Sequence, residues 1–131
     1  MTKAHFKRAV PYADDAMNLP VNDLDAAIPF YLTIFGLKLV SRSNSPYPSV
    51  VLARDDIEIG LAENGGDPTQ EGCFFEVDDV EKAFHELQSN GLNNDDPKYS
   101  VEDFGGPLSY KVFYVVAPDG LCYCTGEKIE E

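Results

Sequence analysis

The chain has 131 residues and a mass of 14.5 kDa, which is enough for one domain. Its 10 basic and 23 acidic residues give a formal net charge of −13 and a pI near 4.3. Nucleic acids and anionic membrane surfaces attract cationic patches, so this charge argues against both as partners. It suits a neutral or cationic ligand, or simply a very soluble protein. The charge is uneven, because residues 1–65 hold 8 acids and 6 bases whereas residues 66–131 hold 15 acids and 4 bases.

Two further features of the composition concern the cellular compartment. No apolar run approaches the ~20 residues of a membrane span, and the N-terminus lacks the apolar core of a signal peptide. The three cysteines, Cys73, Cys122 and Cys124, are odd in number and lack the spacing of a metal clip. The sequence therefore predicts a cytoplasmic protein whose cysteines are free thiols.

The N-terminal half is predicted to contain a strand, a helix and three further strands. Residues 1–14 precede them as an arm or an extra edge strand. Apolar residues at three-to-four spacing predict a helix that begins near Asp25, capped by Asp23 or by Asp25 itself. This start places Pro29 in the first turn, and Gly36 ends the helix. Alternating apolar residues predict strands at 16–21, 37–43, 49–54 and 57–63.

The C-terminal half repeats this order. The capping acid Asp23 precedes Gly36 by 13 residues, and Asp78, its counterpart as a helix cap, precedes Gly91 by 13. A second amphipathic helix follows Asp78, and strands are predicted at 72–77, 98–103, 109–117 and 121–127. We interpret this as an internal duplication with a period of about 55 residues. A single domain, 1–131, then consists of module one, about 15–63, and module two, about 72–127.

Three segments of this repeat carry a family resemblance: "LPVNDLDAAIPFYLTIFGLKLV", "FFEVDDVEKAFHELQSNGL" and "APDG". With them the chain resembles the vicinal oxygen chelate superfamily, which includes glyoxalases, bleomycin-resistance proteins and dioxygenases, and it is most similar to the bleomycin-resistance branch. The resemblance implies an α+β fold in which two βαβββ modules form a curved mixed sheet around a cleft. It also implies a homodimer.

The resemblance further assigns the positions that hold a divalent metal in the enzymes of the superfamily. In this chain they fall on Ala16, Gly72, Cys124 and, in the last strand of module one, Glu58. Alanine and glycine side chains cannot donate to a cation, and a divalent centre needs about three or four protein donors. The two histidines, His5 and His85, are predicted to lie on the surface. We therefore expect a protein without a metal or another cofactor.

Strand alternation places the neighbours of these positions in the same cleft. The predicted lining consists of Asn18, Tyr47, Glu58, Phe74, Glu76, Tyr110, Phe113, Cys122 and Cys124. Aromatic rings with carboxylates suit a planar, partly cationic ligand, so we expect a protein that sequesters or senses a hydrophobic, aromatic small molecule. No catalytic residue is predicted. One alternative is an enzyme that works through metal at Glu58 and Cys124, or through a cleft carboxylate. The other is a dimerising domain whose cleft is filled by its own side chains.

Overall fold

The computed structural model describes residues 4–11, 16–93, 96–103 and 107–129. Within these residues it contains a five-stranded sheet in the order β1-β6-β9-β8-β7 and a four-stranded sheet in the order β2-β5-β4-β3. The two α-helices are α1 (Leu24–Thr33) and α2 (Val80–Ser89), and a short 3-10 helix spans Pro68–Gln70. The strands are β1 (Phe6–Pro11), β2 (Leu19–Pro20), β3 (Lys38–Ser43), β4 (Ser49–Arg54), β5 (Ile57–Ala62), β6 (Gly72–Val77), β7 (Ser100–Glu102), β8 (Ser109–Val116) and β9 (Cys122–Ile129).

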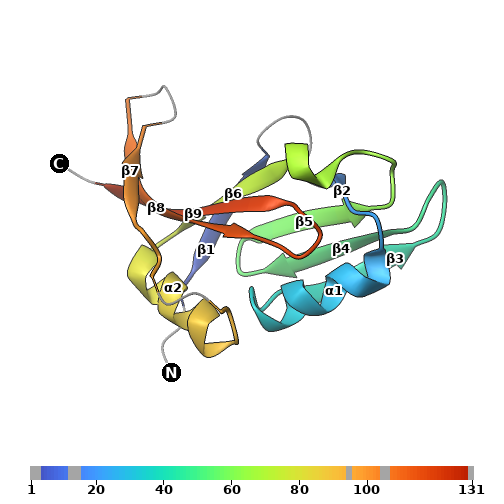
Figure 1. The fold of residues 1–131 in the computed structure, drawn as a ribbon, viewed down its shortest axis with the longest axis horizontal. Coiled ribbons are helices and arrows are strands. Elements are labelled where there is room, and N and C mark those ends of the chain that lie inside the picture. The colour runs from blue at the N-terminus through green and yellow to red at the C-terminus, as the bar shows by residue number, and fades with distance from the viewer. Residues whose placement is uncertain (1–3, 12–15, 94–95, 104–106, 130–131) are drawn as a thin grey trace.

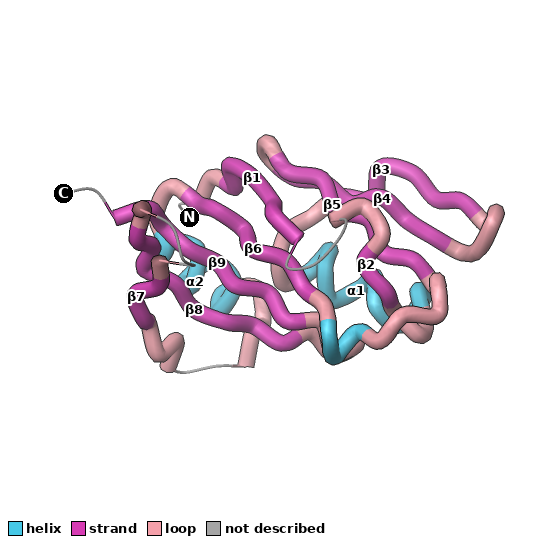
Figure 2. The backbone as a smooth tube through the Cα atoms, turned by 90° about the horizontal axis from the view of Figure 1, so that it is seen from above, coloured by secondary structure: helices cyan, strands magenta, loops and turns pink. Residues whose placement is uncertain are grey.

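The two sheets repeat one topology. The first strand of each module pairs in parallel with the last, β2 with β5 and β6 with β9, and the remaining pairs are antiparallel. The expected α+β fold of two βαβββ modules is confirmed. β1 lies outside the repeat: it joins β6 as an antiparallel edge strand and lies between β6 and β5 (Figure 2).

Helix α1 begins one residue earlier than predicted. The side chain of Asp23 accepts the Ala26 N–H at 3.2 Å, and the carboxylate of Glu63 accepts the Leu24 N–H at 2.9 Å. These two acceptors satisfy N–H groups that a helix leaves without partners in its first turn. Pro29 is consequently the sixth residue of the helix, beyond the first turn where the sequence placed it, and it is exposed.

Helix α2 is capped by Asp79 and not by Asp78. The side chain of Asp79 accepts the Lys82 N–H at 3.0 Å, while Asp78 accepts the backbone N–H of His5 at 2.9 Å. The prediction placed the cap one residue too early because both neighbours are aspartates, which cap helices equally well. Asp78 does not cap the helix because its side chain binds the N-terminal arm, which is remote in sequence.

The first strand of module one is much shorter than the predicted 16–21. Residues 16–18 form a turn that crosses β5, and the carbonyl of Ala16 accepts the N–H of Gly60 at 2.8 Å. A Cβ atom at Gly60 would lie 2.1 Å from the carbonyl oxygen of Met17. The turn therefore depends on glycine at position 60.

Both helices cover the same side of the two sheets (Figures 1 and 2). The main core lies between the helices and the sheets, and rings from both modules meet in it. Phe35 of module one lies 5.4 Å from Phe75 and 5.3 Å from Tyr123 of module two, measured between ring centroids. The modules therefore share one core, which leaves the opposite side of the sheets without a helical cover.

A buried ion pair also joins the modules. Arg54 at the end of β4 donates from Nη1 to Glu86 Oε2 of α2 at 2.6 Å and from Nη2 to Glu86 Oε1 at 3.3 Å. The same guanidinium donates to the carbonyls of Phe35 at 2.7 Å and Ala4 at 2.9 Å. One arginine thus links module one, module two and the N-terminal arm. Among the described residues, no helix is long and apolar enough to span a membrane.

Candidate functional site

The side of the five-stranded sheet that faces away from the helices is the candidate site, and we call it the open face. Residues paired across neighbouring strands point to the same face, so the ladder identifies its members. The first row across β1, β6, β9 and β8 consists of Val10, Phe74, Cys124 and Tyr114. The second consists of Arg8, Glu76, Gly126 and Val112, and the third of Gly72, Cys122 and Val116.

Phe74 and Tyr110 form a small hydrophobic cluster on the open face, separate from the main core. Their rings meet edge to face with centroids 5.2 Å apart, and Val112 and Cys124 complete the cluster. A Cβ atom at Gly126 would lie 2.6 Å from Val112 Cγ1 and 3.0 Å from Phe74 Cε1. Glycine at this position therefore allows the Phe74 ring to lie over β9. The side chains of the chain itself fill this part of the open face.

Beside this cluster the open face exposes apolar side chains. Val10 is 37%, Tyr114 44% and Val116 66% exposed. Cys122, which lies next to Val116 in the third row, is partly buried. Exposed apolar side chains on both sides of rings held by packing form a surface suited to a hydrophobic ligand.

The thiol of Cys124 is fully buried on the open face, which disfavours its thiolate form. Burial, as the largest effect, raises its pKa to about 12, although a hydrogen bond with Tyr114 acts in the opposite direction. Burial also raises the pKa of Tyr114 to about 12, with Cys124 adding to the shift. Because the thiolate is the nucleophile, a thiol that stays protonated at neutral pH is a poor nucleophile. All three cysteines of the chain are free.

The other end of the open face carries an ion pair. Arg8 Nε donates to Glu76 Oε1 at 2.6 Å, and Arg8 Nη2 donates to the Tyr110 hydroxyl at 3.2 Å. The hydrogen bond with Glu76 is the main cause that raises the pKa of Arg8 above its ordinary value. Lys7 also approaches Glu76, at 4.0 Å. The negative charge of Glu76 is therefore balanced by cations of the same chain.

The structure brings five of the nine predicted lining residues together. They are Phe74, Glu76, Tyr110, Cys122 and Cys124, all on the open face. Three others belong to the four-stranded sheet and its loops, where the Tyr47 hydroxyl donates to Asn18 Oδ1 at 3.2 Å and Glu58 is exposed on β5.

Phe113 does not line the open face, so its inclusion in the predicted cleft is wrong. It is fully buried in the main core, with its ring centroid 5.5 Å from that of Phe84 and 6.2 Å from that of Tyr99. Successive side chains of a strand alternate between its faces, so Phe113 and Tyr110, three residues apart on β8, point to opposite sides.

Sequence reasoning missed five side chains of these rows: Arg8, Val10, Val112, Tyr114 and Val116. Two of them are in β1, whose pairing partner could not be read from the sequence. The other three share the parity of Tyr110 on β8, so the same alternation that excludes Phe113 would have found them.

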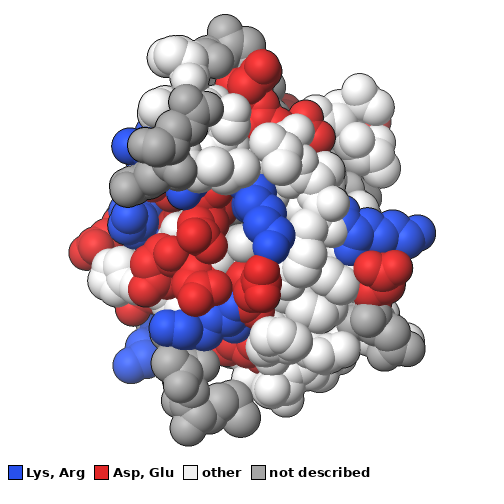
Figure 3. All heavy atoms as spheres, turned by 90° about the vertical axis from the view of Figure 1, so that its left-hand side faces the viewer, with Lys and Arg blue, Asp and Glu red and all other residues white. Residues whose placement is uncertain are grey.

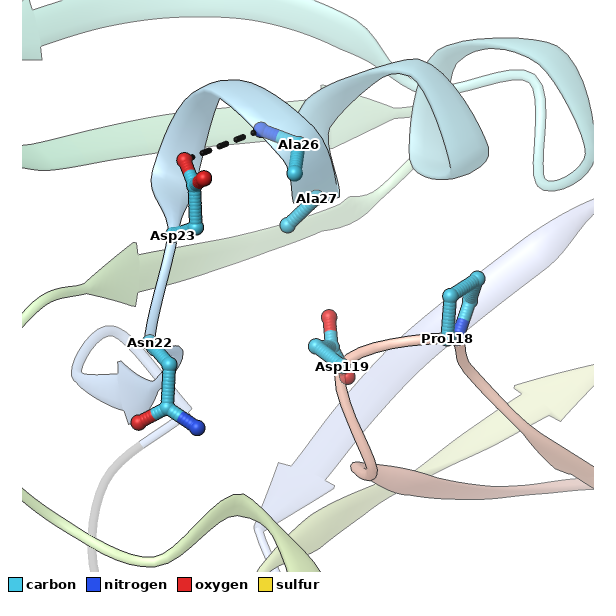
Figure 4. Close-up of a pocket in the computed structure, with 6 residues that line it drawn as sticks. All are labelled: Asn22, Asp23, Ala26, Ala27, Pro118 and Asp119. Carbon is cyan, nitrogen blue, oxygen red and sulfur yellow. Dashed lines mark hydrogen bonds between the residues drawn. The ribbon is translucent and has the colours of Figure 1, made fainter.

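Two hollows lie away from the apolar part of the open face. One of about 230 Å³ lies between the start of α1 and the β8–β9 turn, and Figure 4 shows Asp23 and Asp119 on its two sides. Asp119 accepts the Tyr31 hydroxyl at 2.7 Å, and burial raises the pKa of its carboxyl.

The second hollow, of about 650 Å³, lies at the end of the five-stranded sheet where β6 and β9 finish. Acidic side chains gather at this end of the molecule with basic ones beside them (Figure 3). Its charged lining consists of Lys7, Glu76, Asp78, Lys111, Glu127 and Lys128. Several of these charges pair within the chain, as Lys111 does with Glu81.

The residues at the family's metal positions do not fit a divalent metal. Ala16 and Gly72 have no side-chain donor atom, and the Cys124 thiol is fully buried. Glu58 lies on β5 of the other sheet. In the part of the chain that the structure describes, no three His, Cys, Asp or Glu side chains come together as metal ligands.

Comparisons with known proteins agree with this fold. A chain from the mobile metagenome of V. pseudocholerae is 19% identical with a TM-score of 0.64, covering 99% of this chain and 98% of that one. A bleomycin-binding protein complexed with bleomycin is 24% identical with a TM-score of 0.62, covering 88% and 98%. Lactoylglutathione lyase from Agrobacterium tumefaciens is 21% identical with a TM-score of 0.62, covering 88% and 93%. No curated protein matches the sequence.

At these identities the solved structures establish the fold alone. Family membership rests on a separate match: the model of the glyoxalase/bleomycin resistance protein/dioxygenase superfamily matches residues 14–102, more than half of the chain. That range contains the duplicated strand–helix signal of both modules. The chain belongs to the glyoxalase/bleomycin resistance protein/dioxygenase superfamily.

Proposed function

We propose that this protein binds a hydrophobic, aromatic small molecule on its open face, sequestering or sensing it without a metal and without catalysis. The observation that carries the proposal is the exposure of Val10, Tyr114 and Val116 beside the packed rings of Phe74 and Tyr110. A flat apolar ligand gains from burying such side chains and from edge or face contacts with the rings. The bleomycin-binding protein that shares the fold supports a ligand of this kind.

The cations beside Glu76 limit the charge that a ligand of the open face can carry. The sequence favours a positive charge, but Glu76 already pairs with Arg8 and Lys7. A cationic ligand on the open face would have to displace these partners. The open face therefore favours an apolar, planar ligand over a cationic one.

An uncharged naphthalene dye, N-phenyl-1-naphthylamine, tests the proposal on protein stripped of metal by chelation. We expect saturable binding, with amide shifts in a ¹H–¹⁵N spectrum concentrated at Val10, Phe74, Cys124 and Tyr114. Val116→Glu should weaken the binding several-fold, because it places a charge on the apolar part of the open face. The matched control is Val101→Glu on β7, since Val101 is 64% and Val116 66% exposed, yet Val101 pairs with Lys111 on the other face.

Two results would contradict the proposal. The first is that the dye does not bind, or that its binding shifts amide resonances outside the open face. The second is turnover of a substrate that depends on added divalent metal and is lost in Glu58→Gln. That second result would establish the enzymatic alternative.

We also propose that the protein is a homodimer in a reducing compartment such as the cytoplasm. The free cysteines support the compartment. Support for the dimer comes from β3, an edge strand with Leu39 46% and Val40 55% exposed, because apolar edge strands tend to pair with another chain. Light scattering coupled to gel filtration should give a mass near 29 kDa, twice 14.5 kDa. Val40→Lys should shift it towards 14.5 kDa, and a monomer at every concentration would refute the dimer.

A further inference from the structure

Arg8 presents an unused edge of its guanidinium group at the open face. The planar group has five N–H donors, and the two that bind Glu76 and Tyr110 belong to Nε and Nη2 on one edge. Among the described residues, no hydrogen-bond partner is found for Nη1. The side chain is 55% exposed, so the edge formed by Nη1 and the second Nη2 proton is open to a ligand.

The partners of Arg8 also orient this edge. Glu76 is only 13% exposed and holds Nε at 2.6 Å, and the Tyr110 hydroxyl, on a ring packed against Phe74, holds Nη2. Because two hydrogen bonds fix one edge of the guanidinium group, the N–H groups of its opposite edge form a fork with a fixed orientation. Such a fork binds both oxygens of a carboxylate, sulfonate or phosphate with two parallel charge-assisted hydrogen bonds.

The position of the fork relative to the apolar surface defines the ligand further. Val10 follows Arg8 by two residues on β1, so the two side chains share a face and lie about 7 Å apart along the strand. Val10 begins the row that ends at the exposed Tyr114. An anionic group on Arg8 would therefore place an attached ring system of two or three rings over Val10 and towards Tyr114.

We propose that the ligand of the open face is a planar aromatic compound that carries an oxyanion, and that Arg8 binds this oxyanion. The inference rests on the proposed function for its apolar part and adds the chemical class of the ligand. The net charge of −13 does not oppose it at this location, because the two rows that hold Arg8 and Tyr110 contain Lys128 beside two carboxylates, Glu76 and Glu102, and Lys7 approaches Glu76. In this proposal β1, the strand that carries Arg8, selects the ligand.

Two dyes that differ by one sulfonate separate the two parts of the proposal. N-phenyl-1-naphthylamine reports the apolar surface, and 8-anilino-1-naphthalenesulfonate has the same rings with an oxyanion. Arg8→Gln should weaken binding of the sulfonate about tenfold, the range expected for a hydrogen bond to a charged group, and should change binding of the uncharged dye by less than twofold. Arg8→Lys should fall between, because lysine keeps the charge and loses the fork.

The matched control is Arg42→Gln on β3. Arg42 is also exposed, at 41%, and pairs with a carboxylate, Asp25, at 2.7 Å, so the substitution makes the same charge change away from the open face. It should leave the affinity for both dyes within twofold of the wild type. Unchanged far-ultraviolet circular dichroism in each variant establishes that folding is intact.

The outcomes distinguish the two proposals. If wild-type protein binds both dyes and Arg8→Gln weakens neither, the role of Arg8 is refuted and the proposed function stands. The role of Arg8 is also refuted if Arg42→Gln weakens the sulfonate as much as Arg8→Gln does, because net charge would then explain the effect. If neither dye binds the wild type, the proposed function fails and the inference fails with it.

Discussion

The buried ion pair between Arg54 and Glu86 allows a sharp test of how the two modules are held together. Both side chains are almost inaccessible, at 8% and 2% exposed, and two hydrogen bonds join them. Glu86 Oε1 also accepts the backbone N–H of Ala4 at 3.1 Å. The substitution Glu86→Gln keeps the size of the side chain and removes its charge, so it tests the ion pair with little change in packing.

The structure sets the expected magnitude. Removing one partner of a buried ion pair leaves an uncompensated charge, which typically costs about 3–5 kcal/mol. Arg54 would still donate to Asp55 at 3.1 Å and to the carbonyls of Phe35 and Ala4. Because these acceptors remain, we expect the lower end of the range, a loss of about 3 kcal/mol in the free energy of unfolding. For a chain of this length that is a fall of about 10–15 °C in Tm.

Urea unfolding of Glu86→Gln, with Glu81→Gln as the control on the same helix, measures the effect. Glu81 is 59% exposed and pairs with Lys111, so its substitution should cost less than about 0.5 kcal/mol. A double-mutant cycle with Arg54→Met should give a coupling of about 2 kcal/mol, because the second substitution removes the charge that the first leaves with Asp55 as its carboxylate partner. A loss below about 1 kcal/mol in Glu86→Gln, or no coupling, would refute the reasoning.

Three further substitutions test separate parts of the structure. Thr125→Val should raise the free energy of unfolding by about 1 kcal/mol in urea, because the buried Thr125 hydroxyl has no hydrogen-bond partner among the described residues; a decrease would contradict this. Gly126→Ala should lower it by about 1–3 kcal/mol and weaken dye binding, because the added Cβ overlaps Val112 and displaces Phe74. Burial raises the pKa of Asp119, so its favourable contribution is present below pH 3.8 and is lost as the pH rises through the raised value. Asp119→Asn should therefore gain stability relative to wild type across that window, as thermal unfolding at a series of pH values would show.

The elements whose bounds were predicted correctly are those that depend on the local sequence pattern. The strands at 49–54 and 72–77 have the predicted bounds, because apolar alternation and flanking turn residues act within a few positions. The duplicated order of strands and helices also followed from local signals. Since the resemblance covered both modules, the fold class needed no contact between distant residues.

The errors arose where a distant contact decided between similar residues. Asp78 and Asp79 are equivalent as helix caps in the sequence, and the N–H of His5, more than 70 positions away, separates their roles. The pairing of Arg54 with Glu86 likewise depends on how the modules meet. The inclusion of Phe113 in the cleft was different in kind, because strand parity alone contradicts it.

The N-terminal strand connects the two questions of stability and binding. Phe6 binds module one at both its backbone groups, since its N–H donates to Asp55 at 3.0 Å and its carbonyl accepts the Asp56 N–H at 3.1 Å. Its ring enters the shared core, where Arg54 stacks on it 4.3 Å from the centroid. Two residues later, Arg8 is on the open face and pairs with Glu76 of module two. The group that we propose to select the ligand therefore stands on a strand that both modules hold, so its position depends on their packing as well as on its own ion pair.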